Sequence, residues 1–298
     1  MNTRKKHING KAYLEKHIFA CVVIGACILI GFVWTYGISQ LESVIETLIS
    51  EKVVPPGGIK KLPTASSATT FRIPILLYHY VEYVKDPKDT IRQSLNVIPR
   101  IFDQQLKTLT DAGYTCITAS ELADILDGKT MAPPKPILIT FDDGHWDLYT
   151  DVLPILEKYH VKATAYIISG FIGAPDFLSQ KQLQKVIQSG LVEIGAHTVH
   201  HIALAKKLRP FVQYEVSQSK ATLENMYRLP VVSFAYPDGS YDQQAAEIVQ
   251  SAGFRTAVST TPGIAQNQAH KFFLYRLRPG ARTGEALLHY LQQIIIKN

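Results

Sequence analysis

The chain has little cysteine. Its 298 residues include three cysteines, and two of them, Cys21 and Cys27, lie in an apolar stretch near the N-terminus. Cys116 is the only cysteine outside that stretch, so the rest of the chain can form no internal disulfide. Any metal bound there must therefore be held by histidine and carboxylate side chains rather than by thiolates.

The chain also lacks a dense basic surface signal. Its formal net charge is +6, and residues 1–16 supply +4 of it, with five basic residues against Glu15 alone. The small remainder is dispersed, so we expect no nucleic-acid partner. Gly128-Lys-Thr130 is not a phosphate-binding loop, because it lacks the upstream glycine that such a loop needs.

One long apolar run is present, at Ile18 to Ile38. Its 21 residues carry no charge, which is enough to cross a bilayer as a helix. The basic residues before it should stay cytoplasmic, so we expect a single-pass anchor in a bacterial cell membrane and an extracytoplasmic main domain. The alternative is a cleaved signal peptide, for which Gly37 and Ser39 offer small residues.

The rest of the chain predicts a short stalk and one folded domain. A cytoplasmic segment (1–17), the membrane helix (18–38), and a stalk and linker (39–70) would precede a domain at 71–298. Strand-like and helix-like stretches alternate there, which favours βα units, a mainly parallel sheet and an α/β fold. We expect a deformed (β/α) barrel that need not close completely. Its strand candidates are Ile73–Tyr78, Thr115–Thr118, Ile137–Phe141, Ala163–Ile168, Val192–Ala196, Val231–Tyr236, Arg255–Val258 and Phe272–Leu277.

Two adjacent carboxylates end the third of these strands. Ile137 to Phe141 is the nearly continuous apolar run of a strand buried on both faces, and Asp142 and Asp143 follow it. Two like charges side by side need a cation or a shared proton. Gly144 permits a tight turn that keeps both at the strand tip. A plain Asp-Gly turn is the alternative interpretation.

Other polar residues follow the ends of other predicted strands. They are His79, His197, Tyr236 and Arg276. In a parallel barrel the carboxyl ends of the strands share one face, and that face builds the active site. Separate segments of the chain would thus place polar side chains at the same end of the barrel.

The segment from His197 to His201 predicts a metal site. These two histidines are four residues apart, so a helical turn would place both on one face. With one carboxylate of the aspartate pair they would make a site with an open position, as catalytic sites have. Zn²⁺ is the first expectation, and Fe²⁺, Co²⁺ or Mn²⁺ are alternatives. His200 is another candidate ligand, and a surface histidine cluster is the non-functional interpretation.

Three motifs together resemble the polysaccharide deacetylase family, whose domain is of the NodB, carbohydrate esterase 4-like type. They are Thr140-Phe-Asp-Asp-Gly144, Glu193-Ile-Gly-Ala-His-Thr-x-x-His201 and Phe234-Ala-Tyr-Pro-Asp-Gly239. Pro74 to His79 and Phe102 to Ile117 resemble a branch that acts on poly-N-acetylglucosamine. The resemblance covers roughly Phe71 to the C-terminus and implies a NodB-type barrel.

The resemblance also implies roles for individual residues. Asp142 would be the base, Asp143, His197 and His201 the metal ligands, the Tyr236 backbone N–H the oxyanion donor, and His79 the general acid. The chain departs from the family where many members have an arginine, at Phe234-Ala235. Arg276 is our candidate to replace that arginine in holding Asp142, and His289 is a rival acid.

The expected function is metal-dependent removal of N-acetyl groups from an extracellular polysaccharide that contains N-acetylglucosamine. The glycan could be poly-N-acetylglucosamine, peptidoglycan or chitin. Substrate sugars would stack on aromatic residues near the strand ends, for which the candidates are Tyr80, Trp146, Tyr236 and Tyr241. The alternatives are an O-acetyl polysaccharide esterase that uses the same site and a non-catalytic glycan-binding protein.

Overall fold

The structure, a computed structural model, describes residues 69–297. The chain divides into two units, residues 1–64 and 65–298, and the account below concerns the second. The predicted cytoplasmic segment, membrane helix and most of the stalk lie outside the described residues. Within 69–297 no helix is both long and apolar enough to cross a membrane.

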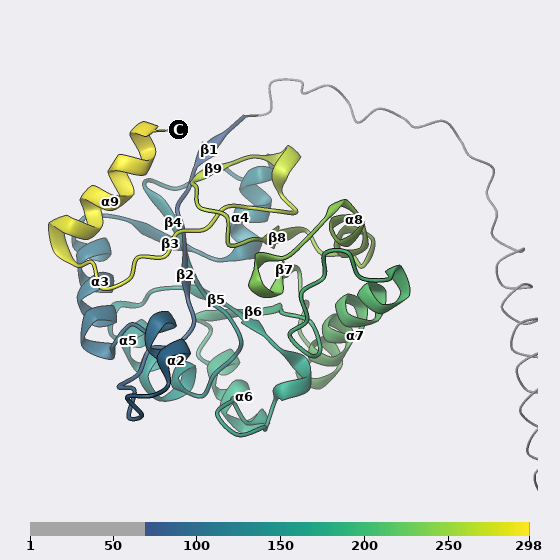
Figure 1. Cartoon of the computed structure of the whole chain (residues 1–298). Coiled ribbons are helices and arrows are strands. Elements are labelled where there is room, and N and C mark those ends of the chain that lie inside the picture. The colour runs from purple at the N-terminus through teal and green to yellow at the C-terminus, as the bar shows by residue number, and fades with distance from the viewer. Residues whose placement is uncertain (1–68, 298) are drawn as a thin grey trace, which may run out of the picture. The chain divides into compact units, whose positions relative to one another are not determined.

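A curled, parallel sheet forms the middle of the domain (Figure 1). Its strands are β2 (Ile75–Tyr78), β3 (Thr115–Ile117), β4 (Pro136–Phe141), β5 (Ala163–Ile167), β6 (Val192–Ala196), β7 (Ser233–Ala235) and β8 (Thr256–Val258). Pairing runs β2-β4-β5-β6-β7-β8, and β3 pairs with the first half of β4. The sheet confirms the expected α/β class, because every pairing in it is parallel.

The sheet closes only loosely between its two outer strands. The segment expected as a strand at Phe272–Leu277 forms isolated parallel bridges instead, from Leu274 to Val258 and from Leu277 to Leu76. The Leu277 N–H donates to the Ile75 carbonyl at 2.8 Å. The barrel is therefore a curled, incompletely closed one, as expected.

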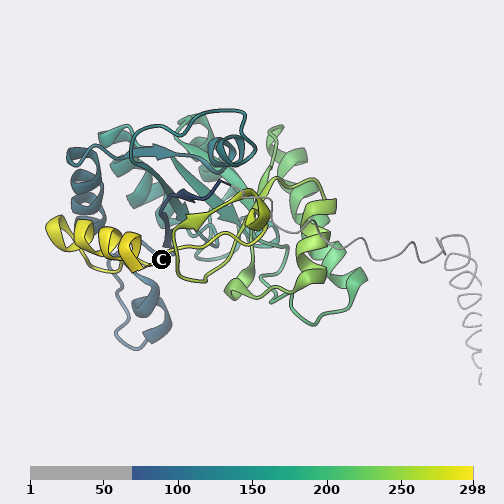
Figure 2. The same cartoon turned by 90° about the horizontal axis from the view of Figure 1, so that it is seen from above.

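Helices surround this sheet, as Figures 1 and 2 show from two directions. Two of them begin with reciprocal side-chain caps, Thr118 with Glu121 and Ser179 with Gln182, which satisfy the free N–H groups of the first turn. The helices are α2 (Thr90–Leu95), α3 (Pro99–Asp111), α4 (Ala119–Leu126), α5 (Leu153–Tyr159), α6 (Gln180–Gln188), α7 (Arg209–Tyr227), α8 (Gln243–Ser251) and α9 (Gly284–Lys297).

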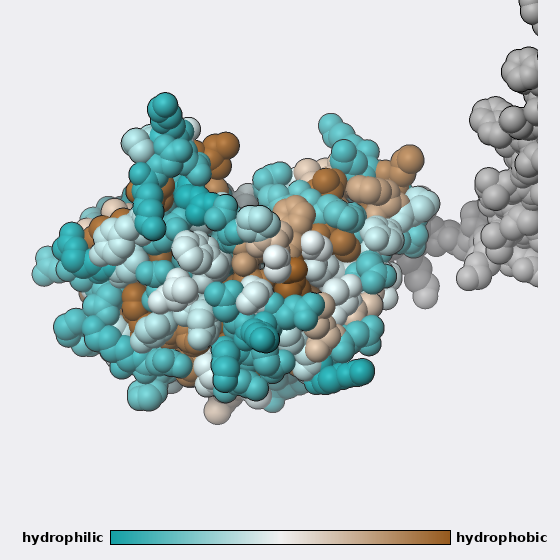
Figure 3. All heavy atoms as spheres, turned by 90° about the horizontal axis from the view of Figure 1, so that it is seen from below, coloured by the Kyte–Doolittle hydropathy of each residue, from teal (hydrophilic) through white to brown (hydrophobic). Residues whose placement is uncertain are grey.

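Short elements complete the fold. A π-helical turn η1 (Leu148–Val152) leads directly into α5. Short 3₁₀ turns η2 (Ser169–Phe171), η3 (Pro237–Gly239) and η4 (Gln268–His270) follow strand or loop ends, and β1 (Phe71–Arg72) pairs antiparallel with β9 (Ala265–Gln266). One face of the domain is mainly hydrophilic, with hydrophobic residues in scattered groups (Figure 3).

The parallel registers bring the strand ends level with one another. Tyr78 pairs with Phe141, Ile167 with Ala196, and Ala196 with Phe234. The residues that directly follow these strands therefore lie along one edge of the sheet, which is where the sequence places its candidate chemistry.

Candidate metal centre and active site

A tight turn separates the two aspartates at the end of β4. The Asp142 N–H continues the sheet by donating to the Tyr78 carbonyl at 3.0 Å, and the Gly144 N–H donates to the Asp142 carbonyl at 3.0 Å. Asp143 and Gly144 have φ of 75° and 84°. A Cβ on Gly144 would lie 2.9 Å from the Ile167 Cδ1, so glycine suits both the conformation and the space.

Asp142 faces a buried arginine. The two terminal guanidinium nitrogens of Arg276 each lie 2.7 Å from an Asp142 oxygen, and its Nε donates to the Ser259 carbonyl at 2.8 Å. Burial raises the pKa of Asp142, but the charge and hydrogen bonds of Arg276, together with the nearby His197 and His79, outweigh burial and hold that pKa below its ordinary value. The structure thus brings together the pair that the sequence suggested, and it keeps Asp142 ionised.

Replacing Arg276 by methionine should strongly destabilise the protein. Arg276 is 1% exposed, so loss of its guanidinium would leave the Asp142 carboxylate buried without this cation. Breaking a buried pair in this way costs about 3–5 kcal/mol. Denaturant unfolding at neutral pH measures the change. Arg278→Met is the control, because Arg278 is exposed and should shift stability by less than about 0.5 kcal/mol. Equal stability of the two variants would contradict the pairing.

Asp143 meets two histidines. Its Oδ1 lies 3.3 Å from the Nε2 of His197 and 3.3 Å from the Nε2 of His201. One ligand atom from each of the three residues lies within 4.8 Å of the others, and this is the one such group that residues 69–297 contain. The expected ligand set is therefore assembled.

These three residues fit a metal ion. Two ligand atoms bound at about 2.1 Å to one tetrahedral metal lie about 3.4 Å apart, close to the observed distances. Asp143 Oδ1 is buried and makes no hydrogen bond. The Nδ1 of His197 lies 2.8 Å from the Ala235 carbonyl, which holds its hydrogen and leaves Nε2 free to bind a metal.

The helical turn predicted between His197 and His201 is wrong. The segment from His197 to His201 is an irregular turn, with φ of 64° at Thr198 and 55° at His201, and not a turn of helix. His200 points elsewhere, because its Nδ1 lies 2.7 Å from a Glu215 oxygen. The structure therefore selects His197 and His201 from the three candidate histidines.

Neighbouring charges also change the pKa of the site residues. Burial favours the neutral acid at Asp143, but His145, His197 and His201 outweigh it and hold the pKa of Asp143 well below its ordinary value. Burial lowers the pKa of His201, but the contact with Asp143 raises it by more. The net effect is a pKa above the ordinary value of histidine. The site thus concentrates negative charge where a cation would bind.

His79 lies in the same pocket, a cavity of about 370 Å³ that also contains Asp142, Asp143 and both histidine ligands. Burial lowers the pKa of His79 to about 4, although the two aspartates oppose that shift. The side chain is therefore neutral at neutral pH, whereas the predicted acid was protonated. The rival acid His289 lies exposed on α9 beside Gln293 and does not line this pocket.

Tyr236 does not fit the role expected of it. Its backbone N–H donates to the Val258 carbonyl at 3.2 Å, and its hydroxyl donates to the Phe272 carbonyl at 2.9 Å. The side chain is fully buried, so it presents no ring to a sugar. Asp238, two residues later, is the residue of this motif that lines the pocket, with φ of 57°.

Of the four aromatic candidates, Tyr80 lines the pocket and the other three do not. The Arg92 guanidinium lies 4.7 Å from the Tyr80 ring centre, and the His145 ring stacks on Tyr80 at 4.1 Å, so part of its ring is already in contact with the protein. Tyr241 stacks on Tyr236 and Phe273. Trp146 is 41% exposed, but neither it nor Tyr241 lines the pocket.

Further residues complete the pocket walls. Sequence reasoning missed them, although Asp238 stood within a quoted motif. Two of them lie on α2, and its six residues are too few to show a helical periodicity in the sequence. The missed lining residues are Ile91, Leu95, His145, Ile168, Phe171, Phe177, Asp238, Thr260 and Arg278.

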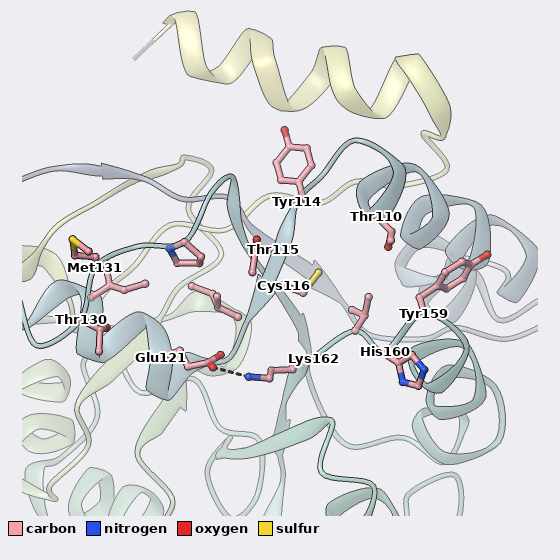
Figure 4. Close-up of a pocket in the computed structure, with 14 residues that line it drawn as sticks. Thr110, Tyr114, Thr115, Cys116, Glu121, Thr130, Met131, Tyr159, His160 and Lys162 are labelled. Carbon is pink, nitrogen blue, oxygen red and sulfur yellow. Dashed lines mark hydrogen bonds and ion pairs between the residues drawn. The ribbon is translucent and has the colours of Figure 1, made fainter.

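A larger cavity, of about 560 Å³, lies by β3 and the segment that leads into β5 (Figure 4). Its Lys162 and Glu121 pair with each other at 2.6 Å. Cys116 is also there, and burial raises the pKa of its thiol to about 12, which makes it a poor nucleophile. This cavity contains none of the metal-site residues.

Comparison with known proteins identifies the family. Residues 129–257 match the family model of polysaccharide deacetylases. The "putative polysaccharide deacetylase YxkH" of Bacillus subtilis (strain 168) is 32% identical over 75% of this chain and 77% of its own length. The poly-beta-1,6-N-acetyl-D-glucosamine N-deacetylase of Staphylococcus aureus (strain MRSA252) is 23% identical over 75% of this chain and 81% of that protein.

A solved structure agrees with the sequence matches. The Streptococcus pyogenes deacetylase PplD, determined in complex with acetate, is 30% identical to this chain. It superimposes with a TM-score of 0.69 over 76% of this chain and 99% of its own. The chain therefore belongs to the polysaccharide deacetylase family and is a deacetylase.

Proposed function

We propose that this deacetylase removes N-acetyl groups from a polysaccharide that contains N-acetylglucosamine. The observation that carries the proposal is that the two adjacent aspartates have different partners. Asp142 is bound by Arg276, whereas Asp143 faces His197 and His201. The poly-N-acetylglucosamine deacetylase among the relatives supports the choice of glycan. The uncharged run at Ile18 to Ile38 supports a membrane-anchored enzyme that works outside the cytoplasm.

Asp143, His197 and His201 would hold a divalent metal, with Zn²⁺ as first choice. When bound, it supplies Lewis acidity and lowers the pKa of water. Asp142 takes a proton from the attacking water as that water adds to the acetamide carbonyl. We assign the oxyanion donor to the Asp238 backbone N–H in place of Tyr236, because Asp238 lines the pocket. A proton reaches the sugar nitrogen as the C–N bond breaks, and acetate and a glucosamine unit result.

Acetate release tests this function directly. The full-length protein is incubated with N-acetylglucosamine oligomers and, separately, with O-acetylated xylan, each with and without a chelator, and its metal content is measured. We expect acetate from the N-acetylated oligomers alone and only in the absence of chelator. Acetate mainly from the xylan would assign an O-acetyl esterase instead, and release that a chelator leaves unchanged would exclude the metal.

His79 remains our candidate for the group that protonates the leaving nitrogen, since it shares the pocket with Asp142. Its pKa of about 4 means that it must gain the proton within the complex, as negative charge develops beside it. His79→Gln should lower kcat by roughly 10²-fold or more and remove the alkaline limb of its pH profile. His289→Gln is the control and should change neither. If the His79 variant keeps the alkaline limb, Asp142 itself returns the proton.

A further inference from the structure

Glu215 is a buried carboxylate that contacts the loop carrying the histidine ligands. It lies on α7 with 0% of its surface exposed. One of its oxygens accepts the Val199 N–H at 2.9 Å and the His200 N–H at 3.0 Å, and the other lies 2.7 Å from the His200 Nδ1. A buried charge is costly unless it is hydrogen-bonded, and these three contacts satisfy it.

The loop between the histidine ligands has a conformation that needs support. Thr198 and His201 both have left-handed φ, which non-glycine residues adopt at a cost of about 1–3 kcal/mol each. Such conformations persist only where the surrounding structure imposes them. His201 is one of the two residues concerned, so its ring position depends on whatever holds this backbone.

The loop is held from two sides. On one side η2 binds its carbonyl groups: the Ser169 N–H donates to the Thr198 carbonyl at 3.1 Å and the Gly170 N–H to the Val199 carbonyl at 3.0 Å. A Cβ on Gly170 would lie 2.5 Å from that Val199 oxygen, so the approach requires glycine. On the other side Glu215 binds the N–H groups.

We propose that Glu215 is a positioning residue of the metal centre. It binds the Val199 and His200 N–H groups, and so fixes the turn that aims His201 at Asp143. It also engages the His200 ring, which removes His200 from competition for the metal. This proposal rests on the proposed function, in that Asp143, His197 and His201 must bind a divalent metal.

Metal affinity, measured in competition with a chelator, tests the proposal with Zn²⁺ as the probe. Glu215→Asp keeps the charge but is one methylene shorter, so it should weaken binding about 10–100-fold, as loss of a supporting partner does. Glu215→Gln keeps an oxygen for both N–H groups and should stay close to wild type. Ser219→Ala is the matched control: Ser219 is equally buried on α7, and its hydroxyl bonds to the Val216 carbonyl of its own helix.

The outcomes separate the inference from the proposed function. If the wild type binds no Zn²⁺, both fall. If the wild type binds it and Glu215→Asp binds it as tightly, only the positioning role falls. Should Glu215→Asp fail to fold, hydrogen exchange in the metal-free wild type decides, because Glu215 should keep the Val199 and His200 amides protected. Fast exchange at both amides would overturn the proposal.

Discussion

Asp143→Ala is expected to abolish both metal binding and deacetylation. Asp143 Oδ1 lies 3.3 Å from the ligand nitrogens of both His197 and His201, so its removal takes the central oxygen out of the set. Loss of the metal removes several kcal/mol of transition-state stabilisation, which corresponds to roughly a 10³-fold or greater fall in kcat/KM. Metal analysis and acetate release from N-acetylglucosamine oligomers, run on the same preparation, measure the two effects together.

The control for this variant is Asp176→Ala. Asp176 is an exposed aspartate near the pocket that contacts Arg92 at 3.3 Å and does not belong to the metal set. It should keep its metal and most of its activity. An Asp143→Ala protein with bound metal, or with full activity in the presence of chelator, would show that the metal lies elsewhere.

Asp142→Asn is expected to lower the catalytic rate without removing the metal, and so to distinguish the role of Asp142 from that of Asp143. Asparagine has nearly the same shape but cannot take a proton from water, so kcat should fall by about 10²–10⁴-fold. The metal content should stay at the wild-type level, because Asp142 contacts Arg276 rather than the histidine ligands. Steady-state kinetics combined with metal analysis thus distinguishes this variant from Asp143→Ala, although the two positions are adjacent.

Two results with Asp142→Asn would contradict this assignment. If Asp142→Asn loses its metal along with its activity, the two aspartates share one role and the assignment of a separate base is wrong. If it keeps its metal and more than about a tenth of the wild-type kcat, another group removes the proton.

The sequence was sufficient where local pattern decides structure. The apolar run from Ile137 to Phe141 predicted a buried strand, and the aspartates after it necessarily lie at its end. The histidine spacing predicted a ligand pair, but through a helical turn, whereas an irregular turn brings His197 and His201 together. That turn depends on contacts from Gly170 and Glu215, which are distant in sequence and show no local signal.

The predictions that differ from the structure concern features that depend on contacts between residues distant in sequence. Whether the Tyr236 N–H is available depends on its pairing with Val258, which no local pattern reveals. Tyr80 does line the pocket, but the contacts of its ring with Arg92 and His145 were not predicted, and Arg92 lies on α2. That helix has six residues with apolar side chains at only Ile91 and Leu95, too few for a helical periodicity.

The loosely bridged segment between Leu274 and Leu277 has a consequence for biosynthesis. It carries Arg276, which lies 134 residues after the carboxylate it neutralises. A nascent chain therefore completes β4 long before the cation that its Asp142 needs has been synthesised. Contacts so distant in sequence form late, since their loop-closure entropy must first be overcome. The reaction centre should thus assemble in one of the last folding events, when the C-terminal segment docks between β8 and β2. A polypeptide released before residue 276 would remain catalytically inert.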